Sequence, residues 1–286
     1  MTHSPVSFVT SLQKMRTSLP ENSIQPVSYY LALNEDKDNL QEICLNELIG
    51  QKLTISYQGE IHCQHCGRKT KKSFAQGYCY PCFTKLPQCD QCIMSPEKCH
   101  YDQGTCRDPQ WGERFCMQDH YVYLANSSGV KVGITRGTQI PTRWIDQGAV
   151  QALPIFRVAT RRLSGLIETL YKEQVADKTN WRAMLKGQVD TLDLKAIQQE
   201  LFEQFKSSIQ QLQTEYGADA IEVLDEQAIE IDYPVSEYPT KIVSMNLDKT
   251  PEISGTLMGI KAQYLIFDTG VINIRKFSSY KVTVEH

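Results

Sequence analysis

The chain has 286 residues, of which 41% are hydrophobic and 22% charged, and its formal net charge is −3. That length allows two or three modest domains, and the composition is ordinary for a soluble globular protein. A slightly acidic chain is not a general binder of polyanions, so contact with nucleic acid would need a local basic patch. No stretch approaches the roughly 20 apolar residues of a membrane span, so we expect no membrane partner.

The N-terminal residues 1–6 lack the basic start and apolar run of a secretory signal. We therefore expect a cytoplasmic protein in a reducing compartment, where clustered cysteines bind metal more often than they form disulfides. A phosphate-cradling glycine loop, a Ser-His-Asp signature and a dinucleotide fingerprint are all missing from the sequence.

The expected fold class is α+β. Residues 1–60 contain strands expected over 28–33 and 52–57, which can pair with strands of the C-terminal region. Residues 61–119 are rich in Cys, Gly, Pro and Lys and lack apolar periodicity, as is typical of a zinc-binding region in which metal replaces a hydrophobic core. Residues 120–187 open with a hairpin over 121–134 and continue into a helix, whose apolar residues recur at helical spacing from Leu163 to Val175.

Residues 188–218 are expected to form one long amphipathic helix over 191–216, with Gly217 where a C-cap belongs. Residues 219–286 contain short β-type segments separated by turn residues, which predicts a small C-terminal β-barrel-like domain or curled sheet. These segments are 220–224, 228–233, 241–245, 254–259, 263–267, 271–274 and 281–284. If the N-terminal strands complete this domain, the metal and hairpin regions form an insertion in it.

Nine of the ten cysteines lie between Cys63 and Cys116. Two pairs, Cys63-x2-Cys66 and Cys79-x2-Cys82, are separated by twelve residues, which is a zinc-ribbon spacing. Each pair fits a tight turn that aims two sulfurs at one point. Together they predict a tetrahedral four-thiolate zinc site, and such closed sites are normally structural rather than catalytic.

A second zinc site has seven candidate ligands for four positions: Cys89, Cys92, Cys99, His100, Cys106, Cys116 and His120. Cys89-x2-Cys92 has the knuckle spacing, and Cys116-x3-His120 has the separation of the second half of many finger sites. Our preferred set is Cys92, Cys99, Cys116 and His120. A set of Cys89 and Cys92 with Cys99 or Cys106 is an alternative, and so is the absence of a second metal.

Four basic residues crowd the first knuckle: Arg68, Lys69, Lys71 and Lys72. They can contact the phosphates of DNA or RNA. They can equally offset the negative charge that four thiolates leave on a zinc site. The two interpretations are compatible.

The hairpin and the segment after it resemble the core of GIY-YIG nucleases over roughly residues 120–185. The likeness is carried by Val122-Tyr123-Leu124, by Lys131-Val132-Gly133, and by Arg143, Glu168 and Asn180 in that order. It implies metal-dependent hydrolysis of phosphodiesters, with Mg²⁺ or Mn²⁺ held by Glu168. Arg143 would contact the developing phosphorane oxygens, Tyr123 would orient or deprotonate the attacking water, and Asn180 would brace the site.

Two positions depart from that family pattern. Lys131 stands where a tyrosine is usual, and Gln147 stands where many members have a histidine. A lysine is a poor base unless its pKa is lowered, although it suits a phosphate contact, and a glutamine can position water without taking its proton. The site is therefore either an altered nuclease or a core retained for binding.

Each of these residues also has a structural interpretation. Tyr123 can be strand core, and Arg143 can pair with a carboxylate such as Asp146. Glu168 can pair with Arg161, Arg162 or Lys172, and Asn180 can cap the helix that follows it.

The whole chain resembles an uncharacterised bacterial family that joins cysteine knuckles to this degenerate core. The likeness is carried by Gly77-Tyr-Cys-Tyr-Pro-Cys-Phe, Lys131-Val-Gly-Ile-Thr-Arg, Thr142-Arg-Trp-Ile-Asp-Gln-Gly-Ala and Asp177-Lys-Thr-Asn-Trp-Arg. It implies Cys92, Cys99, Cys116 and His120 as the second ligand set and supplies no activity. The leading hypothesis is a zinc-stabilised, nucleic-acid-directed protein with a nuclease-like core. The alternatives are a non-catalytic nucleic-acid-binding module and a protein-interaction adaptor.

Overall fold

The computed structural model describes residues 6–20, 25–33, 41–175 and 178–286. Residues 1–5, on which the expectation about a secretory signal mainly depends, lie outside these ranges. Among the helices that the structure describes, none is both long and apolar enough to cross a membrane. The α-helices are α1 (Tyr80–Lys85), α2 (Gln91–Met94), α3 (Pro109–Phe115), α4 (Thr142–Asp146), α5 (Arg161–Tyr171), α6 (Trp181–Leu185) and α7 (Leu194–Tyr216).

Strands are spread along the chain from one end to the other, and with the helices they make an α+β architecture, as expected. They are β1 (Ser7–Ser11), β2 (Arg16–Ser18), β3 (Ser28–Ala32), β4 (Glu42–Cys44), β5 (Lys52–Ile61), β6 (His120–Asn126), β7 (Val130–Arg136), β8 (Gln151–Val158), β9 (Ile221–Val223), β10 (Ile229–Glu230), β11 (Glu252–Lys261), β12 (Tyr264–Phe267), β13 (Gly270–Asn273) and β14 (Tyr280–Glu285).

The chain forms two compact units. Unit 1 comprises Met1–Thr84, Leu185–Gly187 and Asp232–His286, and unit 2 comprises Lys85–Met184 and Gln188–Ile231. The cysteine-rich region is therefore divided between the two units, with the two paired knuckles in unit 1 and the later cysteines in unit 2.

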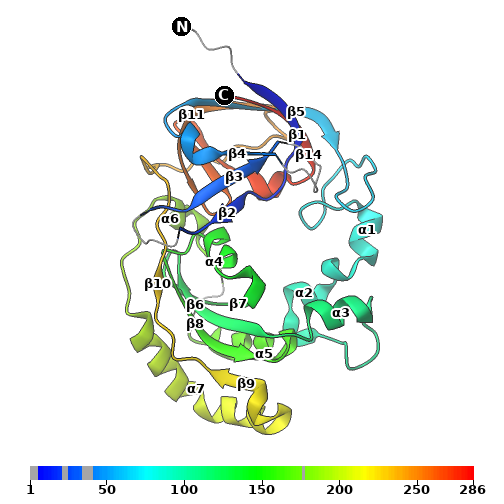
Figure 1. Ribbon diagram of the computed structural model, residues 1–286, viewed down its shortest axis with the longest axis vertical. Coiled ribbons are helices and arrows are strands. Elements are labelled where there is room, and N and C mark those ends of the chain that lie inside the picture. The colour runs from blue at the N-terminus through cyan, green and yellow to red at the C-terminus, as the bar shows by residue number, and fades with distance from the viewer. Residues whose placement is uncertain (1–5, 21–24, 34–40, 176–177) are drawn as a thin grey trace. The chain divides into compact units, whose positions relative to one another are not determined.

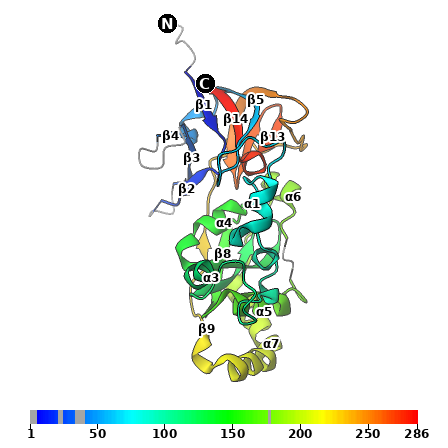
Figure 2. The same cartoon turned by 90° about the vertical axis from the view of Figure 1, so that its right-hand side faces the viewer.

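Unit 1 is built on a six-stranded antiparallel sheet in the order β1-β14-β5-β11-β12-β13. Strands β1 and β5 from the N-terminal region thus pair with β14 and β11 from the C-terminal region, and Figure 2 shows β1, β14 and β5 side by side. Along β14, Val282 and Val284 are buried, whereas Lys281 and Thr283 between them are partly exposed. This alternation marks a sheet with one core face. Strands β2, β3 and β4 form a second, three-stranded sheet.

The expected C-terminal barrel is wrong, because the large sheet is open. Over the described residues its edge strands, β1 and β13, do not pair with each other. The edge at β13 is instead covered by the segment 243–245. Val271 N donates to Val243 O, and Met245 N donates to Val271 O, both at 2.8 Å. Covering an edge with a neighbouring segment protects it from outside strands without closing the sheet.

Unit 2 is built on a five-stranded sheet in the order β10-β8-β6-β7, with β9 also paired to β8. Helices α5 and α7 cover one face of this sheet, where Val122 and Leu124 join Ile167 and Phe205 in one hydrophobic core (Figure 1). Side chains alternate along a strand, so Tyr123 points to the opposite face, and its ring meets Trp144 of α4 at 5.9 Å between centroids. The hairpin therefore directs its tyrosine away from the α5–α7 core.

Candidate metal centre and hairpin site

The two cysteine pairs of unit 1 converge. The sulfur atoms of Cys63, Cys66, Cys79 and Cys82 all lie within 4.8 Å of one another, and the Cys66 and Cys79 sulfurs are 3.7 Å apart. Zinc–sulfur bonds of about 2.3 Å in tetrahedral geometry place two sulfurs about 3.8 Å apart. The four thiols therefore fit one zinc ion.

Backbone geometry builds this cluster. Gly67 has a φ of +69°, which other residues rarely adopt, and its N–H donates to Cys63 O at 2.9 Å. The two turns are joined by Gln64 N, which donates to Gly77 O at 2.8 Å. Burial would raise the pKa of the Cys63 thiol, but the backbone N–H groups around it lower that pKa to about 6. Cys63 is therefore ready to serve as a thiolate ligand near neutral pH.

The basic residues beside the first knuckle, Arg68, Lys69, Lys71 and Lys72, are all exposed. Two of them have protein partners. Lys69 Nζ lies 2.8 Å from Glu60 Oε1, and Lys72 Nζ lies 5.2 Å from the centroid of the Phe74 ring. These contacts place part of the patch in the packing of the knuckle itself.

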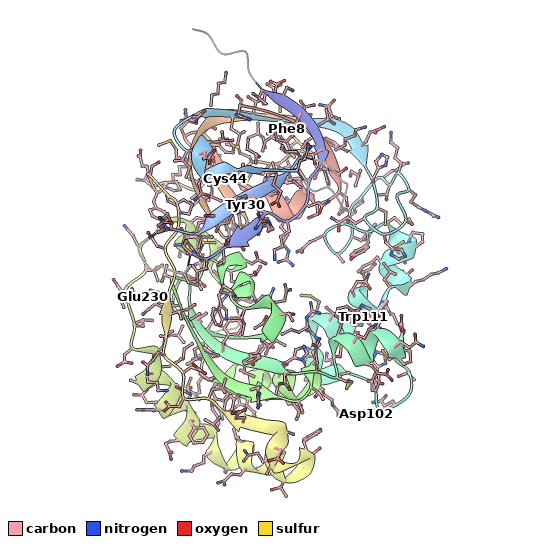
Figure 3. All side chains as sticks on the ribbon, in the orientation of Figure 1. Phe8, Tyr30, Cys44, Asp102, Trp111 and Glu230 are labelled. Carbon is pink, nitrogen blue, oxygen red and sulfur yellow. The ribbon has the colours of Figure 1, made fainter. Side chains whose placement is uncertain are left out.

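The cysteines of unit 2 surround a small cavity of about 20 Å³. Its lining includes Cys92, Cys99, Cys106 and Cys116, together with Asp90, His100 and Trp111. Figure 3 labels Trp111. Ligand atoms of Asp90, Cys92 and His100 lie within 4.8 Å of one another. Over the described residues, the preferred set of Cys92, Cys99, Cys116 and His120 is not among the sets that converge within that distance.

His120 is wholly buried at the start of β6. Its Nδ1 lies 2.8 Å from the carbonyl oxygen of Gln118, whereas its Nε2 has no hydrogen-bond partner in the described part of the chain. Burial lowers the pKa of His120 to about 4, so the ring is neutral at physiological pH. A neutral imidazole with one nitrogen anchored is the form that binds metal.

Gly133, the last residue of Lys131-Val132-Gly133, makes room for the side chain of Tyr123. Tyr123 on β6 pairs with Gly133 on β7. A Cβ atom at Gly133 would lie 2.6 Å from the Tyr123 hydroxyl oxygen, which is closer than real Cβ contacts come. Only glycine leaves room for the buried ring against the neighbouring strand.

Tyr123 lies at the centre of the hairpin site, which comprises Tyr123, Arg143, Gln147 and Glu168. Its hydroxyl group donates to Gln147 Oε1 at 2.9 Å. Burial raises the pKa of Tyr123 to about 12; the charge and hydrogen bond of Arg143 oppose that rise, and the charge of Glu168 adds to it. Tyr123, Arg143 and Glu168, from β6, α4 and α5, thus lie within electrostatic reach of one another. A phenol with this pKa is a poor general base near neutral pH.

The remaining expected site residues have structural contacts of their own. Lys131 is 3% exposed, and its Nζ donates to Thr179 Oγ1 at 2.6 Å. Asn180 Oδ1 accepts from Ala183 N at 3.2 Å and so caps α6, as the structural interpretation expects. Glu168 Oε2 lies 3.2 Å from Lys172 Nζ.

Sequence reasoning missed two residues of unit 2. Asp90 belongs to a converging set of ligand atoms, and its position between two knuckle cysteines was the available signal. Arg161 interacts with Cys116, Cys92 and His120. No spacing rule could have found it, since it lies 41 residues beyond His120.

Fold and site together define an α+β protein with a four-cysteine cluster suited to zinc. The chain matches the family model described as "Protein of unknown function (DUF2797)" over residues 50–282. This match covers most of the chain, which therefore belongs to that family. Comparisons with curated proteins and with solved structures find no significant match.

Proposed function

We propose that the protein is a zinc-stabilised, nucleic-acid-directed phosphodiester hydrolase with an altered GIY-YIG-like core in unit 2. The observation that carries the proposal is the cluster around the Tyr123 phenol. Arg143 on α4, Gln147 directly after α4 and Glu168 on α5 all interact with it, and they follow one another in the order that the resemblance implies. A reducing cytoplasm would keep the cysteine cluster available for zinc.

Glu168 is the residue assigned to the divalent metal. Mg²⁺ is commonly held by one or two carboxylates, with water and substrate phosphate completing its shell, so a single carboxylate at 13% exposure fits it. When bound, the ion supplies Lewis-acid polarisation of the phosphate. Arg143 contributes positive charge for the oxygens that gain charge in the transition state.

In this mechanism Tyr123 and Gln147 orient the attacking water rather than deprotonate it. Because the phenol donates to Gln147 Oε1, the amide nitrogen of Gln147 is left as a donor toward water or a phosphate oxygen. With a pKa of about 12, Tyr123 keeps its proton throughout. The attacking water therefore loses its proton to solvent or to a phosphate oxygen.

Lys131 and Asn180 act as positioning residues in this scheme. The buried Lys131 ammonium is bonded to Thr179, and the N–H of Asn180 donates to Ser128 Oγ at 3.1 Å. Both contacts tie the segment before α6 to the hairpin. Nucleic-acid contact falls instead to exposed cations such as Arg68 and Lys71.

A second candidate is a non-catalytic nucleic-acid-binding module. It is favoured by the complete burial of Tyr123 and by the ion pair between Glu168 and Lys172. In that case the core retains the packing of a nuclease without its chemistry, and binding depends on basic residues and on salt concentration.

The deciding experiment measures cleavage of single-stranded, duplex and branched DNA and RNA with Mg²⁺ or Mn²⁺. Wild type is compared with Glu168→Gln, and Glu173→Gln serves as a matched control because Glu173 is an exposed carboxylate five residues further on. We expect Glu168→Gln to lower the cleavage rate by about 100-fold or more, with Glu173→Gln unchanged. Zinc content should be equal in all three proteins.

Other outcomes select other functions. Cleavage that survives Glu168→Gln would show that the hairpin site is not the active site. Salt-dependent binding without cleavage, unaffected by the same substitution, would establish the binding module. Neither cleavage nor binding at moderate salt would favour an adaptor whose knuckles bind a protein partner.

A further inference from the structure

We propose that unit 2 holds a zinc ion on Asp90, Cys92 and His100, with the fourth tetrahedral position left for water or a small anion. The three residues lie on one short segment of the chain, and together they offer a carboxylate, a thiol and an imidazole. The proposal does not depend on the hydrolysis of nucleic acid. It rests on the distances within this cluster and on the hydrogen bonds that orient its members.

The ligand atoms of the cluster are spaced as they would be around one ion. Those of Asp90, Cys92 and His100 all lie within 4.8 Å of one another, and His100 Nε2 is 3.6 Å from Asp90 Oδ2. Zinc bonds of about 2.1 Å to nitrogen and oxygen, at a tetrahedral angle, place two such atoms about 3.4 Å apart. A direct hydrogen bond would bring them within about 3.2 Å. The observed spacing therefore fits an ion between the two atoms better than a direct contact.

The hydrogen bonds of Thr105 determine which nitrogen of His100 is free to bind a metal. Thr105 Oγ1 donates to the carbonyl oxygen of His100 at 3.3 Å, and the same hydroxyl oxygen lies 2.8 Å from His100 Nδ1. A hydroxyl group has a single proton to donate, so Thr105 Oγ1 accepts from Nδ1–H. In the neutral ring the lone pair is then on Nε2, the nitrogen nearer to Asp90. A histidine that binds metal usually donates its other N–H in this way.

Asp90 precedes helix α2 at the position where a carboxylate usually caps the helix. Over the described residues of α2, however, the Asp90 side chain accepts no capping hydrogen bond. Its Oδ2 instead lies 2.7 Å from Arg107 Nε. A carboxylate has about four lone-pair sites, so the contact with Arg107 leaves capacity for a metal. Arg107 thus holds the carboxylate in place, as the partners of ligating carboxylates do.

Two further thiols lie beside the cluster without joining it. Cys99 and Cys116 line the same cavity of about 20 Å³, and the Cys99 thiol shares a hydrogen bond with that of Cys92. In the part of the chain that the structure describes, neither sulfur lies within 4.8 Å of all three ligand atoms. A cavity of about 10–15 Å³ already admits one water molecule. The cavity therefore has room for a small ligand of the metal.

The charges of the site favour an anion at the open position. One carboxylate and one thiolate neutralise Zn²⁺, and the guanidinium group of Arg107 beside Asp90 adds a positive charge. Three protein ligands with an open fourth position are the arrangement of zinc ions that exchange their fourth ligand. The four-cysteine cluster of unit 1 offers no such position. The two zinc sites would therefore differ in kind, one closed and one open to water, hydroxide or another small anion.

The test is the zinc content of the full chain, purified without a histidine tag and measured by mass spectrometry against protein concentration. Wild type should hold two zinc ions, one in each unit. His100→Ala should hold one, and His100→Cys should restore two, because a thiolate can replace the imidazole. Cys116→Ser is the matched control, since Cys116 lines the same cavity, and it should retain two. Cys99→Ser should also retain two.

Two further measurements examine the site without removing a ligand. Thr105→Val should weaken the affinity of this site for zinc about 10–100-fold in competition with a chelator, because the hydroxyl group orients the imidazole. Thr105→Ser keeps that hydroxyl group and should bind as wild type does. In nitrogen NMR spectra of wild type, zinc should shift the Nε2 resonance of His100 and leave Nδ1 protonated.

Several outcomes would overturn the proposal. They include one zinc ion in zinc-replete wild type, two in His100→Ala, and a loss of zinc from Cys116→Ser. An Nε2 resonance that zinc leaves unchanged would do so even if His100→Ala fails to fold, and would reduce His100 and Asp90 to an ion pair. A loss of zinc from Cys99→Ser would put a fourth thiolate in the open position. Because none of these measurements involves catalysis, an inactive hairpin site would leave the result standing.

Discussion

The four-cysteine cluster of unit 1 and the tyrosine cluster of unit 2 satisfy their polar groups in opposite ways. The partner of the Cys66 thiol is another thiol, since the Cys66 and Cys79 sulfurs are 3.7 Å apart. Around Tyr123 the partners are ordinary side chains, beginning with the Gln147 amide at 2.9 Å. We expect the first arrangement to depend on a bound ion, whereas the second has protein partners for its polar groups. Zinc should therefore hold the fold of unit 1, and any ion at the hairpin should act in function alone.

The largest expected effect tests the first half of that comparison. Cys79→Ser removes a ligand that is only 1% exposed. We expect the loss of one zinc ion per chain and a decrease of about 4 kcal/mol or more in the free energy of unfolding of unit 1, because the metal supplies the folding energy of such knuckles. Denaturant unfolding and zinc analysis measure the two effects.

The matched control is Cys44→Ser, which changes a partly exposed thiol of β4 in the same unit. It should keep its zinc and change the free energy of unfolding by less than about 1 kcal/mol. A chelator should destabilise unit 1 of wild type and leave the stability of unit 1 in Cys79→Ser unchanged. Equal stability of Cys79→Ser and Cys44→Ser would mean that the cluster does not depend on metal.

The comparison also explains how far the sequence could be read. The spacing of Cys63, Cys66, Cys79 and Cys82 predicts their convergence, because two short turns bring their ligands together locally. The tyrosine cluster depends on chain segments that are distant in sequence. Lys131 is bonded to Thr179, 48 residues away, and such a partner has no local signal.

The pairing of strands that are distant in sequence was predictable only in part. Strands β9 and β10 have ordinary strand sequences, and nothing in them indicates that they pair with β8 in unit 2. The expected barrel failed for a related reason. Residues 241–245 have β-type composition, yet they cover the edge of β13 through two hydrogen bonds rather than extending a closed sheet. Alternation predicts that a strand exists and leaves its neighbour undetermined.

A second, smaller effect tests whether the hairpin cluster is held by its own contacts. The pKa of Tyr123 is raised to about 12 in the folded state from about 10 in an unfolded chain. Between these values the folded protein keeps a proton that the unfolded protein has lost. The contribution of Tyr123 to stability is therefore complete below pH 10 and is lost as pH rises toward 12, by about 2–3 kcal/mol in total.

Tyr123→Phe should remove that alkaline decline, at a cost of about 1 kcal/mol at pH 7 for the lost hydrogen bond to Gln147. Tyr121→Phe is the control, since Tyr121 lies on the same strand with a partly exposed ring. Denaturant unfolding at pH 8, 10 and 11 measures the slopes. Identical slopes in wild type and Tyr123→Phe would contradict the assignment of a buried, protonated phenol.

The smallest expected effect asks what Lys172 does for the hairpin site. Its Nζ lies 3.2 Å from Glu168 Oε2, one helical turn away, and such pairs contribute only about 0.3–0.5 kcal/mol. Lys172→Met should therefore barely change stability in the absence of metal. It should, however, increase the affinity for Mn²⁺ severalfold, because the ammonium group occupies one side of the carboxylate that we assign to the ion.

Titration calorimetry with Mn²⁺ measures this affinity. The control is Lys206→Met, which breaks a comparable pair with Glu203 on α7. An unchanged Mn²⁺ affinity would reduce the Glu168–Lys172 pair to an ordinary helix contact, and the tyrosine cluster would then be a fully satisfied core with no place for a cation.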